Sequence, residues 1–279
     1  MRIAILSDIH GNATALHAVL NDAKQFNVDK YILLGDYFDA GPEPVETYNI
    51  LRELNSIAVK GNHDNDLILY SNGHHPEWNN CCLYDSLLWT YKKLSKDMVY
   101  YLSSLPEQAS VFLNENKQAH LAHYLDNITE GIMSEADPGR LNKVLSSINE
   151  SVLMCGHTHN PFNIKIKEKY YINPGSVGQP KKRFAEYFVL VVDKEDLKTI
   201  QRPVPYDIEK VKIAFIKSGY LDEGGICAKM NILSLETGKS YFTPFKNYAR
   251  EYARNVGFNG KDIPKEILIE ASESWDWIV

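Results

Sequence analysis

The sequence of 279 residues has no long apolar run, and this absence excludes a membrane-spanning protein. No stretch approaches the roughly 20 apolar residues that a transmembrane helix needs. The apolar run at residues 1–6 meets Ser7 and Asp8 too early to be the core of a signal peptide. We therefore expect a cytoplasmic protein that is not attached to a membrane.

Cysteine is also scarce, with four residues at positions Cys81, Cys82, Cys155 and Cys227. Their spacing suits neither a zinc ribbon nor a dense disulfide framework. Since free cysteine behaves mostly as a small hydrophobic residue, we expect reduced and partly buried thiols.

An excess of positive charge is absent, because 30 basic residues stand against 36 acidic ones for a net charge of -6. This balance argues against broad nucleic-acid binding and against a polybasic membrane anchor. It does not exclude an anionic substrate, because bound metal ions can reverse the field within one pocket. The hydrophobic fraction of 44% is ordinary for a globular protein, and the length allows one large domain or two small ones.

In the first 160 residues, short β-rich runs end in polar residues and are followed by helical patterns. Residues 2–6, 31–34 and 56–59 are three such runs. This alternation predicts βαβ units, whose polar strand ends gather along one edge of a sheet. Asn12 is expected to cap the first helix.

The remaining segments divide into a helical part and a second β-rich part. We expect helices around 83–94, 98–102, 141–148 and 208–216, and further strands at 110–113, 118–123, 152–155, 162–166, 170–172 and 187–192. Short turns predict that the last three strands are antiparallel neighbours. The C-terminal tail is rich in aromatic residues, which argues against disorder.

The polar residues at the strand ends form one combination of carboxylate, imidazole and amide groups. They are Asp8, His10, Asp36, Asn62, His63, His123, His157 and His159. These ligand types suit Mn²⁺, Fe²⁺ or Zn²⁺, and the absence of thiolate argues against a structural zinc site. Their number exceeds the need of one ion, and phosphoester hydrolases use two ions about 3.5–4 Å apart.

This combination resembles the calcineurin-like metallophosphoesterase superfamily, and in particular its small bacterial and archaeal phosphodiesterase branch. The matching segments are Asp8-Ile9-His10, Gly35-Asp36-Tyr37-Phe38-Asp39, Gly61-Asn62-His63-Asp64, His123, Gly156-His157-Thr158-His159 and Asn173-Pro174-Gly175-Ser176-Val177-Gly178. The resemblance implies an α/β fold, a four-layer α/β/β/α sandwich of two mixed β-sheets flanked by helices. We expect this domain at residues 1–202, with a helical insertion at 65–107, and a helical and aromatic C-terminal extension at 203–279 packed on it.

The resemblance also implies a role for each site residue. The first metal ion would be held by Asp8, His10 and His159, the second by Asn62, His123 and His157, and Asp36 would bridge the two ions. His63 would stabilise the charged phosphorus centre or protonate the leaving oxygen, with Asp39 orienting its ring. A hydroxide that bridges the metals would attack in line, without a covalent intermediate.

One position departs from the family pattern, in which this histidine is usually followed by glycine. Here the segment reads His120-Leu121-Ala122-His123-Tyr124. The strand-end position favours His123 over His120 as the ligand. Tyr124 places a bulky side chain near the second metal site and is expected to narrow the pocket.

Four further residues are candidates for contact with the substrate, namely Asn12, His74, His75 and Arg183. Each has a simpler explanation, because Asn12 also reads as a helix cap and the two histidines as exposed loop residues. Arg183 belongs to the run Lys181-Lys182-Arg183, and a charge run is usually a solvated face.

The superfamily contains phosphatases, phosphodiesterases, pyrophosphatases and nucleases, so the fold does not select the substrate. Relatives of the Ser/Thr phosphatases typically carry arginine where this chain has Ala40 and Lys60. Without these bidentate clamps a dianionic monoester is disfavoured. We predict a dimetal phosphodiesterase or pyrophosphohydrolase acting on a small nucleotide-like substrate such as a dinucleoside tetraphosphate.

Two alternatives remain open from the sequence. The first is a phosphomonoesterase or Ser/Thr protein phosphatase. The second is a non-catalytic protein-binding scaffold like the retromer subunit of this superfamily, although that relative lacks the catalytic histidine that His63 supplies here. The native metals and the oligomeric state stay undetermined.

Overall fold

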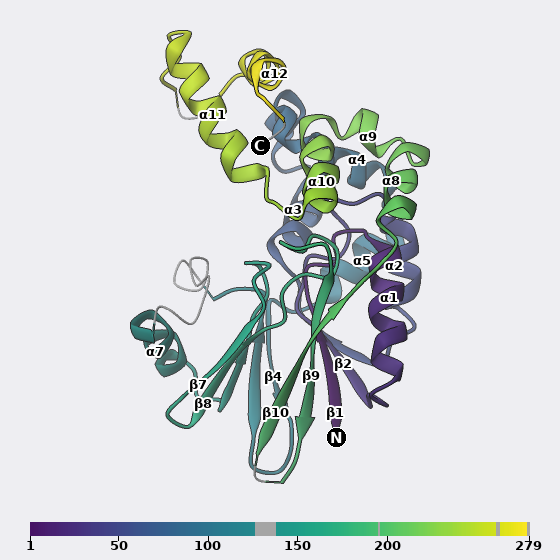
Figure 1. Ribbon diagram of the computed structural model, residues 1–279, viewed down its shortest axis with the longest axis vertical. Helices are drawn as coiled ribbons and strands as arrows, with labels where there is room; N and C mark the ends of the chain where they lie inside the picture. Colours follow the sequence, from purple (N-terminus) through teal and green to yellow (C-terminus); the bar gives the residue numbers. More distant parts are fainter. Residues whose placement is uncertain (126–137, 195, 261–262, 278–279) are drawn as a thin grey trace.

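The computed structural model describes residues 1–125, 138–194, 196–260 and 263–277. Two five-stranded sheets face each other, with helices on their outer sides and a further group of helices above one end (Figure 1). The first sheet has the order β10-β9-β1-β2-β3, with bounds β1 (Arg2–Leu6), β2 (Lys30–Leu33), β3 (Ser56–Ala58), β9 (Ala185–Val192) and β10 (Leu197–Val204). The second has the order β4-β5-β6-β8-β7, with bounds β4 (Gln108–Phe112), β5 (Gln118–Ala122), β6 (Val152–Met154), β7 (Phe162–Ile166) and β8 (Lys169–Asn173).

Both sheets are mixed, as the sequence predicts. Strands β1, β2 and β3 are parallel, whereas β9 runs antiparallel to β1 and β10 antiparallel to β9. In the second sheet β5, β6 and β8 are parallel, and β4 and β7 are antiparallel edge strands. The predicted sandwich of two mixed sheets flanked by helices is therefore confirmed.

The alternation of side chains along β1 explains the layers. Ile3 and Ile5 face the second sheet and join Leu121 and Met154 in the core between the sheets. Ala4 and Leu6, which point the other way, join the core beneath the outer helices. A strand that is buried on both faces reads as an almost continuous apolar run, and β1 has that pattern.

Helices of the first 150 residues cover the outer faces of the sheets. On the first sheet they are α1 (Ala13–Lys24), α2 (Pro44–Leu51), α3 (Asn62–Ser71), α4 (Asp85–Lys93) and α5 (Lys96–Ser104), with the short turns η1 (Pro76–Asn80) and η2 (Cys82–Tyr84) between α3 and α4. α7 (Pro138–Ser147) covers the second sheet through Leu141, Val144 and Leu145. The predicted N-cap of α1 is present, because Asn12 Oδ1 accepts a hydrogen bond from the Ala15 amide.

The C-terminal helices lie above the C-terminal ends of β1 and β2 (Figure 1). Their bounds are α8 (Ile208–Lys217), α9 (Tyr220–Glu223), α10 (Gly225–Thr237), α11 (Phe242–Asn255) and α12 (Lys265–Ser274). An aromatic cluster formed by Tyr241, Phe245, Trp275 and Trp277 joins α11 and α12, and Cys82 of η2 packs on it. The boundary expected after residue 202 stays a prediction, and β10 continues to Val204.

Two strand predictions differ from the structure. The strand containing residues 187–192 is not a neighbour of the strand containing 170–172, because β9 crosses to the first sheet and pairs with β1 and β10. Short turns suggested adjacency, but Ala185 to Val192 are apolar enough to be buried on both faces of the first sheet. Strand β10 was not predicted, because its exposed Lys198, Gln201 and Pro203 interrupt the apolar alternation.

All four cysteines are free thiols, and three of them are buried. Across the described part of the chain, no helix has the length and apolar character required to cross a bilayer.

Candidate active site

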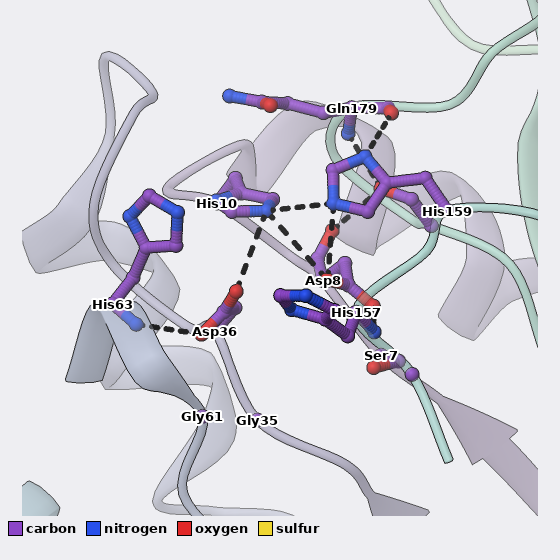
Figure 2. Close-up of polar contacts among 12 residues, drawn as sticks. Ser7, Asp8, His10, Gly35, Asp36, Gly61, His63, His157, His159 and Gln179 are labelled. Carbon is purple, nitrogen blue, oxygen red and sulfur yellow. Dashed lines mark hydrogen bonds and ion pairs between the residues drawn. The ribbon is translucent and has the colours of Figure 1, made fainter. Parts of the chain in front are cut away.

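The candidate site lies at the edge of the sandwich where β1, β2, β5 and β6 end, and Figure 2 shows several of its side chains gathered in one place. Five of its residues have left-handed backbone conformations, with φ of 54° at Asp8, 47° at His10, 58° at Asp36, 69° at His157 and 53° at His159. Non-glycine residues seldom adopt positive φ, and such strain concentrates at functional sites. The sharp turns after the strands aim these side chains into one space.

One group of possible metal donors consists of Asp8, His10 and His159. His159 Nε2 lies 3.0 Å from Asp8 Oδ1 and 3.2 Å from His10 Nε2. Figure 2 shows the two rings and the carboxylate pointing toward one another. Asp8 and His10 are completely buried, whereas His159 is partly exposed to the cleft.

A second group consists of Asp8, Asp36 and His123, so Asp8 belongs to both. His123 Nε2 lies 3.1 Å from Asp36 Oδ2 and 3.9 Å from Asp8 Oδ1. Beside this group, His157 Nδ1 lies 3.0 Å from Asn62 Oδ1. The structure thus brings together all seven predicted metal ligands, although the bridging role of Asp36 stays a prediction.

Backbone carbonyls fix the tautomers of three histidines. The Nδ1 atoms of His10, His159 and His123 lie 3.0 Å from Asp39 O, 2.8 Å from Gln179 O and 2.6 Å from Leu34 O, respectively. A carbonyl only accepts hydrogen bonds, so each Nδ1 carries a proton, and in its neutral form each ring keeps its lone pair on Nε2. Metal-binding histidines are commonly oriented in this way.

The charges in this buried space support the same interpretation. Burial raises the pKa of Asp8, but the neighbouring His159 and His123 outweigh it and lower this pKa to about 2. Burial and His159 lower the pKa of His10 to about 4, whereas Asp36 and Asp8 overcome burial and raise the pKa of His123 to about 9. Near pH 7, Asp8 is therefore ionised and His10 is neutral, whereas the charges of Asp36 and Asp8 favour a positive charge at the position of His123.

Two buried polar atoms test whether these residues fit bound cations. Asp8 Oδ1 and His123 Nε2 make no hydrogen bond of good geometry within the described chain. A buried polar atom without a partner is costly, and coordination of a cation would satisfy both atoms. Carboxylate, imidazole and amide donors fit divalent ions such as Mn²⁺, Fe²⁺ or Zn²⁺.

Asp64 holds the loop that carries Asp36, a role that the sequence analysis did not assign. Its carboxylate accepts hydrogen bonds from the amides of Gly61, Asp36 and Tyr37 at 2.8, 2.8 and 3.0 Å. Burial and the charge of Asp36 raise the pKa of Asp64 to about 6. A Cβ at Gly61 would lie 2.0 Å from Asp36 Oδ1, so only glycine fits there. The spacing of Gly61 and Asp64 is that of a capping box, which is the sequence signal for this contact.

His63 and Asp39 form a pair next to the donor groups. His63 Nδ1 lies 2.7 Å from Asp39 Oδ2, and the His63 side chain is 36% exposed. Burial lowers the pKa of His63, but Asp36 and Asp39 together raise it to about 10. Burial raises the pKa of Asp39, but the hydrogen bond and charge of His63, with smaller contributions from His10 and Ser86, together lower it below its usual value. A cationic imidazole thus faces the cleft beside the metal donors.

The cleft above the donor groups has a volume of about 280 Å³. Its floor is formed by His10, Asp36, His63, His157 and His159. Its walls come from the segment after β8 and from the C-terminal helices, and they include Gln179, Pro180, Lys181, Ser234, Lys239, Ser240 and Phe242. A smaller cavity of about 110 Å³, bordered by Leu83, Tyr84 and Leu87, shares His63 and Phe242 with it. The extension therefore closes one side of the site.

Lys181 is the cation of the run 181–183 that lines the cleft, whereas Lys182 and Arg183 are exposed. Burial lowers the pKa of Lys181, and the charge of Asp8 partly opposes this effect. The Lys181 ammonium group is therefore within electrostatic reach of the donor groups. Arg183 was the predicted contact, but the sequence pattern does not reveal which member of the run turns inward.

The other predicted substrate residues lie elsewhere. Asn12 is buried and its amide is used structurally, because it caps α1 and donates to Gly178 O at 3.1 Å. His74, His75 and Arg183 are not among the described residues that line the cleft. His75 contacts Glu77 at 2.9 Å and stacks on Trp78.

The structure also distinguishes the two histidines of β5 and the turn after it. His120 Nε2 contacts Gln108 Oε1 at 3.0 Å, away from both donor groups. His123 contacts Asp36. The Tyr124 ring lies 5.1 Å from the His157 ring, beside the second donor group.

Comparison with known proteins finds a matching family model, a sequence relative and similar solved structures. A family model described as the calcineurin-like phosphoesterase superfamily domain matches residues 1–196. An uncharacterised protein of Methanocaldococcus jannaschii is 32% identical over 234 residues, which are 77% of this chain and 92% of that protein. A metallophosphoesterase structure from Sphaerobacter thermophilus is 26% identical with a TM-score of 0.63, and the match covers 85% of this chain and 99% of that one. The fold is also that of a hypothetical protein from Pyrococcus horikoshii, with 22% identity, a TM-score of 0.72 and coverage of 86% and 99%.

Proposed function

Because the chain belongs to the calcineurin-like phosphoesterase superfamily, we propose that it is a two-metal phosphohydrolase that cleaves a phosphodiester or phosphoanhydride bond. The proposed substrate is small and nucleotide-like, for example a dinucleoside tetraphosphate. One observation carries the proposal: members of both converging donor groups line the same cleft as His63, which is paired with Asp39. The net charge of -6 supports a small substrate over a nucleic acid.

The donor groups suggest which residues hold each ion. We assign Asp8, His10 and His159 to the first ion and Asn62, His123 and His157 to the second, with Asp36 between them. When bound, two dications polarise the phosphoryl oxygens and lower the pKa of a bound water. The Nδ1 contacts to backbone carbonyls keep the histidine Nε2 atoms directed at this space.

His63 supplies the proton chemistry in this proposal. Its Nδ1–H donates to Asp39, so the second ring nitrogen, Nε2, is available to the cleft. From there it can donate a hydrogen bond to a phosphoryl oxygen or a proton to the leaving oxygen. The carboxylate of Asp39 stabilises the cationic ring that performs either task.

The walls of the cleft support a diester or anhydride substrate. No arginine is among the described residues that line the cleft, so a bidentate clamp for a dianionic monoester is absent there. Lys181 and Lys239 instead supply separate positive charges, and Phe242 supplies an aromatic surface. A substrate with a second anionic group and a planar base would use all three.

Activity measurements on metal-loaded protein test the proposal. Metal-free protein is supplied with Mn²⁺, Fe²⁺ or Zn²⁺ and assayed with bis(p-nitrophenyl) phosphate, p-nitrophenyl phosphate and dinucleoside polyphosphates. We expect metal-dependent turnover with a higher kcat/KM for the diester or the dinucleoside polyphosphate. A preference for the monoester would identify a phosphomonoesterase, and the absence of turnover on every substrate would leave the non-catalytic scaffold.

A further inference from the structure

The second carboxylate oxygen of Asp39 is held by hydroxyl groups. Asp39 Oδ2 accepts from His63, while Oδ1 accepts from Ser86 Oγ at 3.0 Å and from Thr90 Oγ1 at 3.2 Å. Asp39 is only 3% exposed, so these contacts and not water determine the plane of its carboxylate. The orientation of the His63 ring therefore depends on α4, which carries both hydroxyls.

The chain of hydrogen bonds continues from Ser86 into the C-terminal extension. Tyr220 Oη lies 2.7 Å from Ser86 Oγ, and Asn231 Nδ2 lies 2.9 Å from Tyr220 Oη. Since the Asp39 carboxylate can only accept, Ser86 donates to it and must itself accept from Tyr220. Asn231 then donates to Tyr220, so every donor in the chain points toward Asp39.

The far end of the chain is fixed in the same way. Asn231 Nδ2 also donates to the Ala40 carbonyl at 3.0 Å, which determines the orientation of the Asn231 amide. Gln179 Nε2 donates to the same carbonyl at 2.9 Å and to Asn231 Oδ1 at 3.2 Å. Ala40 directly follows Asp39 and has a φ of 74°, so the extension also holds the strained turn next to the carboxylate.

Packing leaves Tyr220 little freedom. Its side chain is fully buried, with ring centroids 4.6 Å from Trp89 and 5.1 Å from Phe215. Burial raises the pKa of Tyr220 well above its usual value, so its hydroxyl stays a donor. Asn231 is 2% exposed and Ser86 5% exposed, so water does not compete with the chain.

We infer that Tyr220 and Asn231 are positioning residues for His63, acting through Ser86 and Asp39. The inference rests on the proposed role of His63 toward the leaving group. In this arrangement the extension does more than close the cleft, because it orients the proton donor of the site.

Substitution of the Tyr220 hydroxyl tests this inference through the leaving group. In Tyr220→Phe the ring stays in place, but Ser86 loses its donor and Asp39 is held less firmly. For the metal-loaded enzyme, we expect kcat on a phenyl phosphodiester to fall about tenfold, with KM unchanged, because part of the proton transfer is lost. On a 2,4-dinitrophenyl phosphodiester, whose leaving group needs no proton, we expect less than a roughly twofold change.

Tyr206→Phe is the matched control. The Tyr206 hydroxyl is also buried, but it has no hydrogen-bond partner within the described chain. This variant should leave both rates unchanged. An equal loss on the two diesters in Tyr220→Phe would show a general structural role and overturn the inference.

A double-mutant cycle tests the route through Ser86. If Tyr220 acts through Ser86, then Tyr220→Phe has no further effect in a Ser86→Ala background. Independent, multiplicative effects on kcat would overturn the inference. Asn231→Ser removes the side-chain amide that donates to Tyr220. As in Tyr220→Phe, we expect kcat to fall on the phenyl diester and to change little on the 2,4-dinitrophenyl diester.

A metal-free measurement separates this inference from the proposed function. In protein with ¹⁵N-labelled histidine, the Nδ1–H signal of His63 reports its hydrogen bond to Asp39. We expect Tyr220→Phe to shift this signal and Tyr206→Phe to leave it in place. If no phosphate ester is turned over, the proposed function fails, yet a shifted signal still supports the positioning role. An unchanged signal would overturn that role whatever the activity.

Discussion

The floor and the wall of the cleft are built in different ways. On the floor, His10, Asp36 and His157 lie in strained turns that follow strands, so a few residues of local sequence determine where each side chain points. On the wall, Phe242 and Ser234 depend on helices that are held at the cleft by long-range contacts, namely the cluster around Phe245 and the hydrogen bonds of Asn231. The comparison teaches that the metal-donor residues are positioned by local sequence, whereas the wall and the hydrogen bonds that reach Asp39 from Tyr220 depend on the tertiary packing of the extension.

The largest effect is expected from Asp36→Asn on the floor. The change preserves size and removes the charge beside His123 and His63, so we expect kcat/KM to fall by about 10³ or more, together with loss of bound metal. Steady-state kinetics and metal analysis by mass spectrometry measure both effects. Although burial raises the pKa of Asp36, the contacts with His123 and His63 hold it well below its usual value, so the substitution also removes stabilising contacts, and circular dichroism establishes that the variant is folded before it is assayed. Full metal content with unchanged activity would contradict the bridging role.

The second-largest effect is expected on metal binding, and it distinguishes His123 from the nearby His120. His123→Ala should weaken binding of one metal ion by at least about 10²-fold, since its Nε2 lies beside Asp36. His120→Ala is the matched control, because His120 contacts Gln108 and Glu150 instead. Metal titration followed by calorimetry measures the difference. Loss of an ion in His120→Ala, with none in His123→Ala, would reverse the assignment.

The difference between the floor and the wall of the cleft also explains which features the sequence predicts and which it does not. The motif around Asp8 and the glycine-rich turns carry strong local signals, so the meeting of the site residues at one sheet edge was predictable, and the family resemblance of these motifs implied the sandwich. Tyr220 carries no such signal, because it is one of 17 tyrosines and its partner Ser86 lies 134 positions away. Strand β10 was missed for a related reason: an edge strand with polar exposed positions has little apolar periodicity.

The sequence also does not show which residue of a charge run faces the cleft. Lys181 and Lys182 are equivalent in the sequence, and only the turn after Gln179 directs one of them inward. Lys181→Met should therefore raise KM for a dinucleoside polyphosphate about tenfold, the effect of losing one charge-assisted contact of about 1.5 kcal/mol. Lys182→Met, on the exposed neighbour, is the control and should change KM less than about twofold. Equal effects of the two substitutions would mean that the wall does not select the substrate through Lys181.

The smallest effect is expected from an ion pair that does not line the cleft. Its removal tests whether a distant change alters the floor or the wall. Asp22 of α1 accepts two hydrogen bonds from Arg202 of β10, at 3.0 and 2.8 Å, and these lower the pKa of Asp22. A lowered pKa means that the stabilisation is present above the unfolded value near 3.8 and is lost as the pH falls through the folded value. Asp22→Asn should thus lower the free energy of unfolding by about 1 kcal/mol at pH 7, after allowance for solvent screening. In urea titrations this difference should shrink below about pH 4, while kcat and KM at pH 7 stay unchanged. If the difference in unfolding free energy stayed constant down to about pH 3, the ion pair would not be its cause. An altered KM would show that the packing of β10 affects the wall of the cleft.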